Sequence, residues 1–138
     1  MPEQKIQNDI LGELVWNSKL QWWSNQVEII PGNIVNLSVD IDDTEIPACH
    51  SFTRIQAQEI NLRRFAANQL LERYNKHWNN GTEIDCLTFI ELIKLVSVHI
   101  NTDGSADLFY DDGELFGGHT IIISIDCNGA CEDAQIAG

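Results

Sequence analysis

One long stretch without proline or glycine limits the folds open to this chain more than any other feature. It runs from about His50 to Trp78 and meets a typical helix stop at Asn79 to Gly81. Its apolar residues recur at helical spacing, and one stripe contains Leu62, Ala66, Leu70 and Tyr74. The spacing predicts one long helix, which has to bury this stripe against another layer of the protein.

Segments with the features of β-strands precede the predicted helix. Two apolar runs, GELVW and KLQWW continued by VEII, predict strands that are separated by a turn at Asn17–Ser18. A break at Pro31 to Asn33 ends the second run. The clearest strand follows, because its apolar residues alternate with polar ones: Val35, Leu37, Val39 and Ile41.

The pattern after the long helix predicts a short helix and four strands. Asp85 is placed to cap a helix through CLTFIELIKL. Strands are expected around VSVHI, ADLFY, HTIIISID and EDAQI, with turns at Asp103–Gly104 and Asn128–Gly129. The order βββ-αα-ββββ predicts an α+β fold for residues 1–138, as a single domain with a mainly antiparallel sheet packed against one long and one short helix.

The charge balance excludes nucleic acid as a partner. The chain has 8 Lys and Arg against 21 Asp and Glu, a net charge of −13, whereas phosphate contacts need clustered basic residues. From Leu95 onward there is no Lys or Arg, but there are eight acids: Asp103, Asp107, Asp111, Asp112, Glu114, Asp126, Glu132 and Asp133. Such a segment either keeps the protein soluble or attracts a basic protein partner.

The remaining composition predicts a cytoplasmic protein without a cofactor. No apolar run is long enough for a membrane span, and MPEQKIQNDI lacks the features of a secretion signal. The four cysteines are therefore expected to be free thiols, and no spacing matches a calcium or zinc site. Cys127 and Cys131 form the nearest pair. A two-residue turn at Asn128–Gly129 would separate their thiols, and a three-residue loop would bring them together.

The segment YDDGELFGGHT, residues 110 to 120, is the first candidate for a functional site. Asp111 or Asp112 with His119 could form an acid–base pair of the kind that a hydrolase uses. Alternatively, the segment is a hairpin connection in which His119 lies at the rim of the core and its ring bonds the loop carboxylates. We favour the structural interpretation.

A second candidate lies near the end of the long helix, in LLERYNKHW. Tyr74 and Trp78 share one helix face, and we expect them to pack on the sheet. The candidate functional surface combines both segments and contains Asp111, Asp112, Glu114, His119, Tyr74, Asn75 and Trp78. No G-x-S-x-G motif or other catalytic set is present in the sequence, which favours a binding protein over an enzyme.

Three segments together resemble an uncharacterised bacterial family, a domain of unknown function. They are LLERYNKHW, YDDGELFGGHTIIISID and the terminal EDAQIAG. The resemblance rests on an aromatic-Asp-Asp-Gly, a Phe-x-Gly-His and a closing Asp-Ala-x-Ile-x-Gly, and covers mainly residues 62–138. Gly117 stands where the family pattern has a Trp. The resemblance implies a fold and a bacterial cytosolic setting but no reaction.

Two functions from different classes follow from these observations. The first is an acidic protein-binding module, of the immunity type that neutralises a toxin, with a basic protein as its partner. The alternative is a small-ligand binder or hydrolase-like enzyme that uses Asp111, Asp112 and His119. A self-associating sheet protein is a third possibility, and the sequence predicts no oligomeric state.

Overall fold

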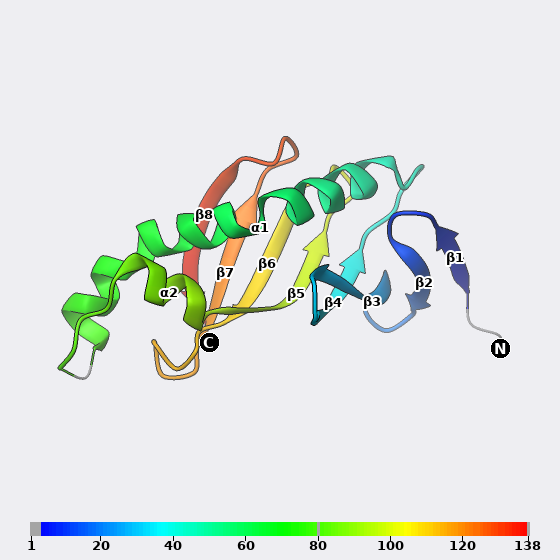
Figure 1. The fold of residues 1–138 in the computed structure, drawn as a ribbon. Coiled ribbons are helices and arrows are strands. Elements are labelled where there is room, and N and C mark those ends of the chain that lie inside the picture. The colour runs from blue at the N-terminus through cyan, green and yellow to red at the C-terminus, as the bar shows by residue number, and fades with distance from the viewer. Residues whose placement is uncertain (1–3, 80, 138) are drawn as a thin grey trace.

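The computed structural model describes residues 4–79 and 81–137, and its strands form one eight-stranded sheet (Figure 1). The strands are β1 (Lys5–Asn8), β2 (Gly12–Asn17), β3 (Trp22–Ile30), β4 (Asn33–Val39), β5 (Lys94–Ile100), β6 (Ala106–Asp111), β7 (Thr120–Ile125) and β8 (Cys131–Ala137). They lie side by side in chain order. Every neighbouring pair is antiparallel except β4 and β5, which are parallel.

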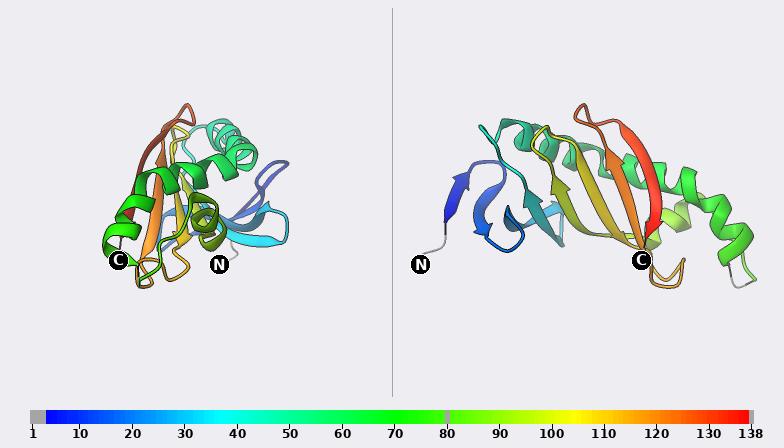
Figure 2. Two further views of the ribbon diagram at one scale, coloured as in Figure 1. Left: turned by 60° about the vertical axis from the view of Figure 1, so that its left-hand side comes forward. Right: turned by 180° about the vertical axis from the view of Figure 1, so that it is seen from behind.

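The helices lie between β4 and β5 in the chain and cover one face of the sheet. They are α1 (Ile46–Arg73), the π-helical turn η1 (Tyr74–Trp78) and α2 (Cys86–Leu92). This crossover is what lets two neighbouring strands run in parallel. Seen from behind, the sheet faces the viewer and α1 lies behind it (Figure 2). The predicted α+β class, with a mainly antiparallel sheet, one long helix and one short helix, is confirmed.

Some details differ from the sequence prediction. Four strands precede the helices, because β1 was missed: its four residues show no clear apolar alternation. The helix α1 begins at Ile46, before His50, and Pro47 suits its first turn because that position needs no N–H donor. At the other end, Asn79 is extended and not left-handed. Asn80, part of the predicted stop, lies outside the described residues.

The alternation of β4 decides which side chains enter the core. Val35, Leu37 and Val39 are buried on the face that α1 covers. The predicted helical stripe from Leu62 to Tyr74 is also buried, as expected. The polar residues between the buried ones therefore point to the opposite, uncovered face of the sheet.

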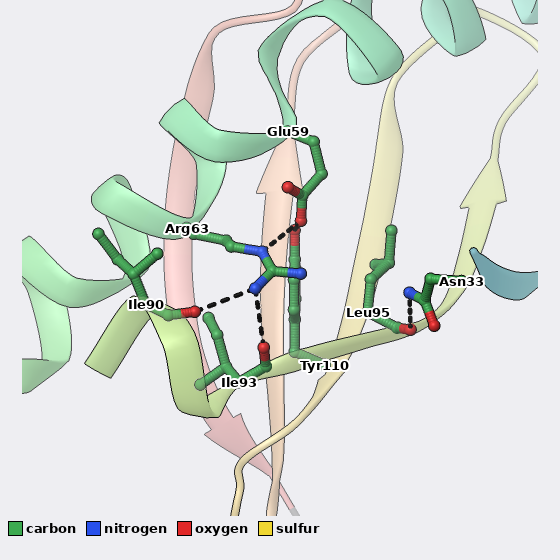
Figure 3. A network of polar contacts seen from close by, with 7 residues as sticks. All are labelled: Asn33, Glu59, Arg63, Ile90, Ile93, Leu95 and Tyr110. Atoms are coloured by element: carbon green, nitrogen blue, oxygen red, sulfur yellow. Dashed lines mark hydrogen bonds and ion pairs between the residues drawn. The ribbon is translucent and has the colours of Figure 1, made fainter. Parts of the chain in front are cut away.

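One buried ion pair ties the helical layer to the sheet (Figure 3). Arg63 Nε lies 2.6 Å from Glu59 Oε1, and Arg63 also donates to the carbonyls of Ile90 and Ile93, both at 3.0 Å. The Tyr110 hydroxyl on β6 donates to the same Glu59 oxygen at 3.1 Å. Burial and the Glu59 carboxylate raise the pKa of Tyr110 well above its usual value, so the phenol stays a donor.

The outer side of α1 carries charged and polar residues along its length. Among the residues that the structure describes, no helix is both long and apolar enough to cross a membrane.

Candidate functional site

A buried carboxylate organises the connection between β6 and β7. Asp112 is 1% exposed and accepts the backbone N–H groups of Glu114 at 2.9 Å, Phe116 at 2.9 Å and Gly118 at 3.1 Å. The neighbouring Asp111 is exposed and accepts one N–H, from Gly113, at 2.8 Å. Both aspartates therefore support the turn of the chain, in the way the turn chemistry of this segment predicts.

Gly113 allows this loop to approach the end of α2. Its φ is +60°, and a Cβ built on it would lie 2.5 Å from the carbonyl oxygen of Leu92. A side chain at this position would be strained and would also collide with backbone.

We expect Gly113→Ala to lower the free energy of unfolding by about 2 to 4 kcal/mol, from left-handed strain plus displacement of the Leu92 backbone. Gly117→Ala is the matched control. Gly117 has a φ of +73° but no atom closer than 3.9 Å to the built Cβ, so only the strain of about 1 kcal/mol applies. Urea denaturation measures both. Equal losses would show that the contact with Leu92 is unimportant.

The two candidate segments meet around one buried aromatic ring. Phe116 is fully buried, and its ring centroid lies 5.9 Å from Tyr74, 5.5 Å from Trp78 and 6.3 Å from Phe89. Trp78 is 41% exposed and packs on this loop residue. The expectation that Trp78 packs on the sheet was therefore wrong. The loop between β6 and β7 extends past the ends of these strands, and its residue Phe116 is the packing partner of Trp78.

His119 is held by the same cluster. Its Nδ1 bonds the carbonyl oxygen of Phe116, and its ring centroid lies 5.7 Å from that of Trp78. The expected bond to the loop carboxylates is replaced by this one, since the oxygens of Asp112 are taken by backbone N–H groups. The ring Nδ1 therefore carries a proton that it donates to the carbonyl.

The other members of the candidate surface lie around this cluster. Asn75 exchanges two hydrogen bonds of 3.0 Å with the backbone of Ile84, and so holds the segment before α2. Glu114 is exposed at the loop. Asp111 and His119 line a cavity of about 380 Å³, whereas Asp112, Tyr74, Asn75 and Trp78 are not among its lining residues. The structure thus joins the aromatic residues of the surface. Of its acidic and basic residues, it brings Asp111 and His119 to one cavity but not Asp112 or Glu114.

The cysteines lie apart from this surface. The turn between β7 and β8 is a loop of three residues, Cys127 to Gly129, because the Asp126 N–H donates to the Ala130 carbonyl across it at 2.9 Å. All four cysteines are free. Burial and Asp126 raise the pKa of Cys131. Within the described ranges, no group of three or more His, Cys, Asp or Glu side chains could hold a metal ion.

A larger cavity lies on the uncovered face of the sheet. It has a volume of about 810 Å³ and lies over strands β2 to β6. We call it the sheet groove, and its lining includes Trp22, Asn36, Ser38, His99, Asp107 and Phe109. Because these side chains lie at the outward positions of their strands, on the face that α1 does not cover, they line a surface that the hydrophobic core does not need.

A chain of hydrogen bonds crosses this groove between the two parallel strands. Ser38 on β4 lies opposite His99 on β5. The Ser38 hydroxyl is 2.7 Å from His99 Nδ1, and His99 Nε2 is 2.9 Å from a carboxylate oxygen of Asp40. An ionised carboxylate can only accept, so in the neutral imidazole Nε2 donates to Asp40 and Nδ1 accepts from the Ser38 hydroxyl. Trp22 packs on the imidazole at a centroid distance of 4.9 Å.

Sequence reasoning missed these residues. The alternation of VNLSVD and VSVHI does place Ser38, Asp40 and His99 on polar strand faces. Nothing local shows, however, that the two strands are neighbours or that Ser38 is opposite His99. Ser38 and His99 become neighbours only because the chain crosses over through α1 and returns to place β5 beside β4.

The charge of the sheet groove has one sign. Among the described residues that line it, His99 and Asp107 are the only ionisable ones, and there is no Lys or Arg. The Asp107 carboxylate accepts from the Ser124 hydroxyl at 2.7 Å, which keeps it oriented on the open face. The groove therefore offers a carboxylate and two aromatic rings, a set of groups that suits a cation.

Fold and groove together define the class: an α+β protein with a mostly antiparallel sheet, covered by helices on one face and grooved on the other. The chain belongs to the bacterial family described as "Uncharacterized protein conserved in bacteria (DUF2262)", whose model matches residues 8–136. The match confirms the resemblance and extends it from residues 62–138 toward the N-terminus, across β2, β3 and β4. No curated protein and no solved structure matches the chain.

Proposed function

We propose that this protein is a binding module that holds a basic segment of a protein partner in the sheet groove. The observation that carries the proposal is the lining of this cavity, in which Asp107 lies among aromatic and uncharged polar residues and, in the part of the chain that the structure describes, no Lys or Arg. An Arg or Lys side chain could pair with Asp107 while its charge lies over the ring of Phe109.

The charge of the whole protein favours the same partner. A net charge of −13 attracts a basic protein over several ångströms and speeds its association, and salt weakens this effect. An immunity-type role, in which the partner is a basic toxin, is the biological setting that we propose. Its support is the acidity, the small size and the presence of a groove that a basic segment would fit.

The alternative function places chemistry at Asp111, Asp112 and His119. The cavity of about 380 Å³ that Asp111 and His119 line is the observation in its favour. Against it, the Asp112 carboxylate is already bonded by three backbone N–H groups, and the His119 ring bonds the Phe116 carbonyl. The geometry therefore supports the sheet groove better than this loop.

The proposal can be tested with a fluorescently labelled Arg-rich peptide as the probe. We expect Asp107→Asn to weaken the binding of this peptide about fivefold, or about 1 kcal/mol, because a charge-assisted contact is lost. Asparagine keeps an oxygen for the Ser124 hydroxyl, so the fold is preserved. Fluorescence anisotropy at several salt concentrations measures the Kd.

Glu91→Gln is the matched control, since Glu91 is an exposed acid on α2 at the helix-covered side of the sheet. It changes the net charge by the same amount but leaves the sheet groove unchanged. If both variants weaken the peptide equally, the attraction comes from overall charge and the groove is not the binding site.

A further inference from the structure

The hydrogen-bonded chain of Ser38, His99 and Asp40 has the connections of a nucleophilic site. We propose that it hydrolyses carboxylic esters in the sheet groove, with Ser38 as the nucleophile, His99 as the general base and Asp40 as the positioning residue. This activity goes beyond the binding function and does not depend on it, because the reacting groups are Ser38, His99 and Asp40 and not Asp107, the carboxylate that the binding function uses.

The geometry meets the requirements for an activated serine. The nucleophile and base are 2.7 Å apart, and the base is held by a third group at 2.9 Å. The side chains of His99 and Asp40 are 17% and 36% exposed, so the base is partly shielded but still reachable. In the triad of serine proteases, Nε2 of the histidine faces the serine and Nδ1 faces the aspartate. Here Nδ1 faces Ser38 and Nε2 faces Asp40. Either nitrogen accepts a proton when the other is held as a donor.

Three features make the arrangement more than a surface hydrogen bond. Ser38 and His99 both line the cavity of about 810 Å³, so a substrate can reach the hydroxyl. The Trp22 ring packs on the imidazole and limits its movement. Gln26 donates to the side-chain oxygen of Asn36 at 3.3 Å, which leaves the Asn36 amide nitrogen as a donor for a substrate oxyanion.

The reaction proceeds through an acyl-enzyme. The Ser38 oxygen forms a bond to the ester carbonyl carbon while its proton passes to His99 Nδ1. The C–O bond to the alcohol then breaks, and the alcohol leaves with that proton. Water attacks the acyl group and gives a proton to Nδ1. Finally, the bond to the Ser38 oxygen breaks, the serine regains the proton, and the carboxylic acid is released.

The groove also indicates the class of ester. Within residues 4–79 and 81–137, its only lining carboxylate belongs to Asp107, and no Lys or Arg lines it to balance a negative charge. Anionic acyl groups are therefore disfavoured, and the substrates that fit are uncharged or cationic esters.

A fluorophosphonate probe tests the site directly because it reacts with activated serine hydroxyls. We expect one adduct on the full chain, located at Ser38 by peptide mass spectrometry and absent from Ser38→Ala. Removing the base in His99→Gln should slow labelling about 100-fold, the usual contribution of a general base. Hydrolysis of a neutral p-nitrophenyl ester should fall in parallel, measured after the free cysteines are blocked.

Ser18→Ala is the matched control. Ser18 is an exposed serine in the turn between β2 and β3 and is not among the residues that line the sheet groove. This variant should label at the parent rate. Asp40→Asn should slow labelling, and Asp40→Glu should recover part of the rate, which a merely structural role would not produce.

Two results would overturn the proposal. One is the absence of an adduct at Ser38 in the native chain under conditions that label a serine hydrolase standard. The other is labelling that continues unchanged in His99→Gln. The native-chain result decides the question even if Ser38→Ala folds poorly, because the adduct is located without any variant.

Discussion

The Arg63→Met variant should have a free energy of unfolding about 3 kcal/mol or more below that of the parent protein. Removing one partner of a buried ion pair leaves the charge of the other partner uncompensated. The side chains of Arg63 and Glu59 are 14% and 9% exposed. Removing the guanidinium also leaves the carbonyls of Ile90 and Ile93 without their donor. Urea denaturation followed by circular dichroism measures the loss.

Arg64→Met provides the matched control. Arg64 is the next residue of α1 and is exposed, so the same change of side chain should alter stability by less than about 0.5 kcal/mol. A similar loss in both variants would mean that the buried network contributes no more than a surface arginine. Glu59→Gln should fall between the two, because glutamine keeps an acceptor for Tyr110 and removes the buried negative charge.

The Asp112→Ala variant should lose about 3 to 5 kcal/mol. Three backbone N–H groups, those of Glu114, Phe116 and Gly118, would lose their acceptor in a loop where Phe116 is fully buried. Thermal and urea unfolding measure the change. Near-ultraviolet circular dichroism should change as well, because the aromatic cluster around Phe116 depends on this loop.

Asp111→Ala is the control for this loop and also tests the candidate functional surface. Asp111 is exposed and accepts a single N–H, so its removal should cost less than about 1 kcal/mol. If Asp111→Ala leaves stability intact but weakens the Arg-rich peptide more than Asp107→Asn does, the loop and not the sheet groove is the binding surface. Equal stability losses in Asp111→Ala and Asp112→Ala would contradict the organising role of the buried carboxylate.

The residues that stabilise the fold and the residues of the proposed functional site lie on opposite faces of the sheet. The network around Arg63 and the Phe116 cluster lie on or beside the helix-covered face, where they hold the layers together. The sheet groove lies on the opposite face, and its polar residues are not needed by the core. Variants in the groove can therefore change binding or reactivity without unfolding the protein.

Local patterns in the sequence determined most of the elements. The alternation of Val35, Leu37 and Val39 determined a strand with one buried face, because side chains of a strand point to opposite sides in turn. Asp85 determined the start of α2, and its side chain accepts from Thr88 N–H at 2.8 Å as a cap should. Such signals are readable because each depends on residues only a few positions apart.

Only the tertiary structure decided which distant residues become neighbours. Ser38 and His99 are 61 positions apart in the sequence, and the packing of α1 across the sheet brings them together because it makes β4 and β5 parallel partners. The same packing decided that Arg63 meets the carbonyl of Ile93 and that Phe116 fills the space beside Tyr74. Pairing at such separations is set by the fit of whole layers, and a register shift of one residue would move Ser38 away from His99.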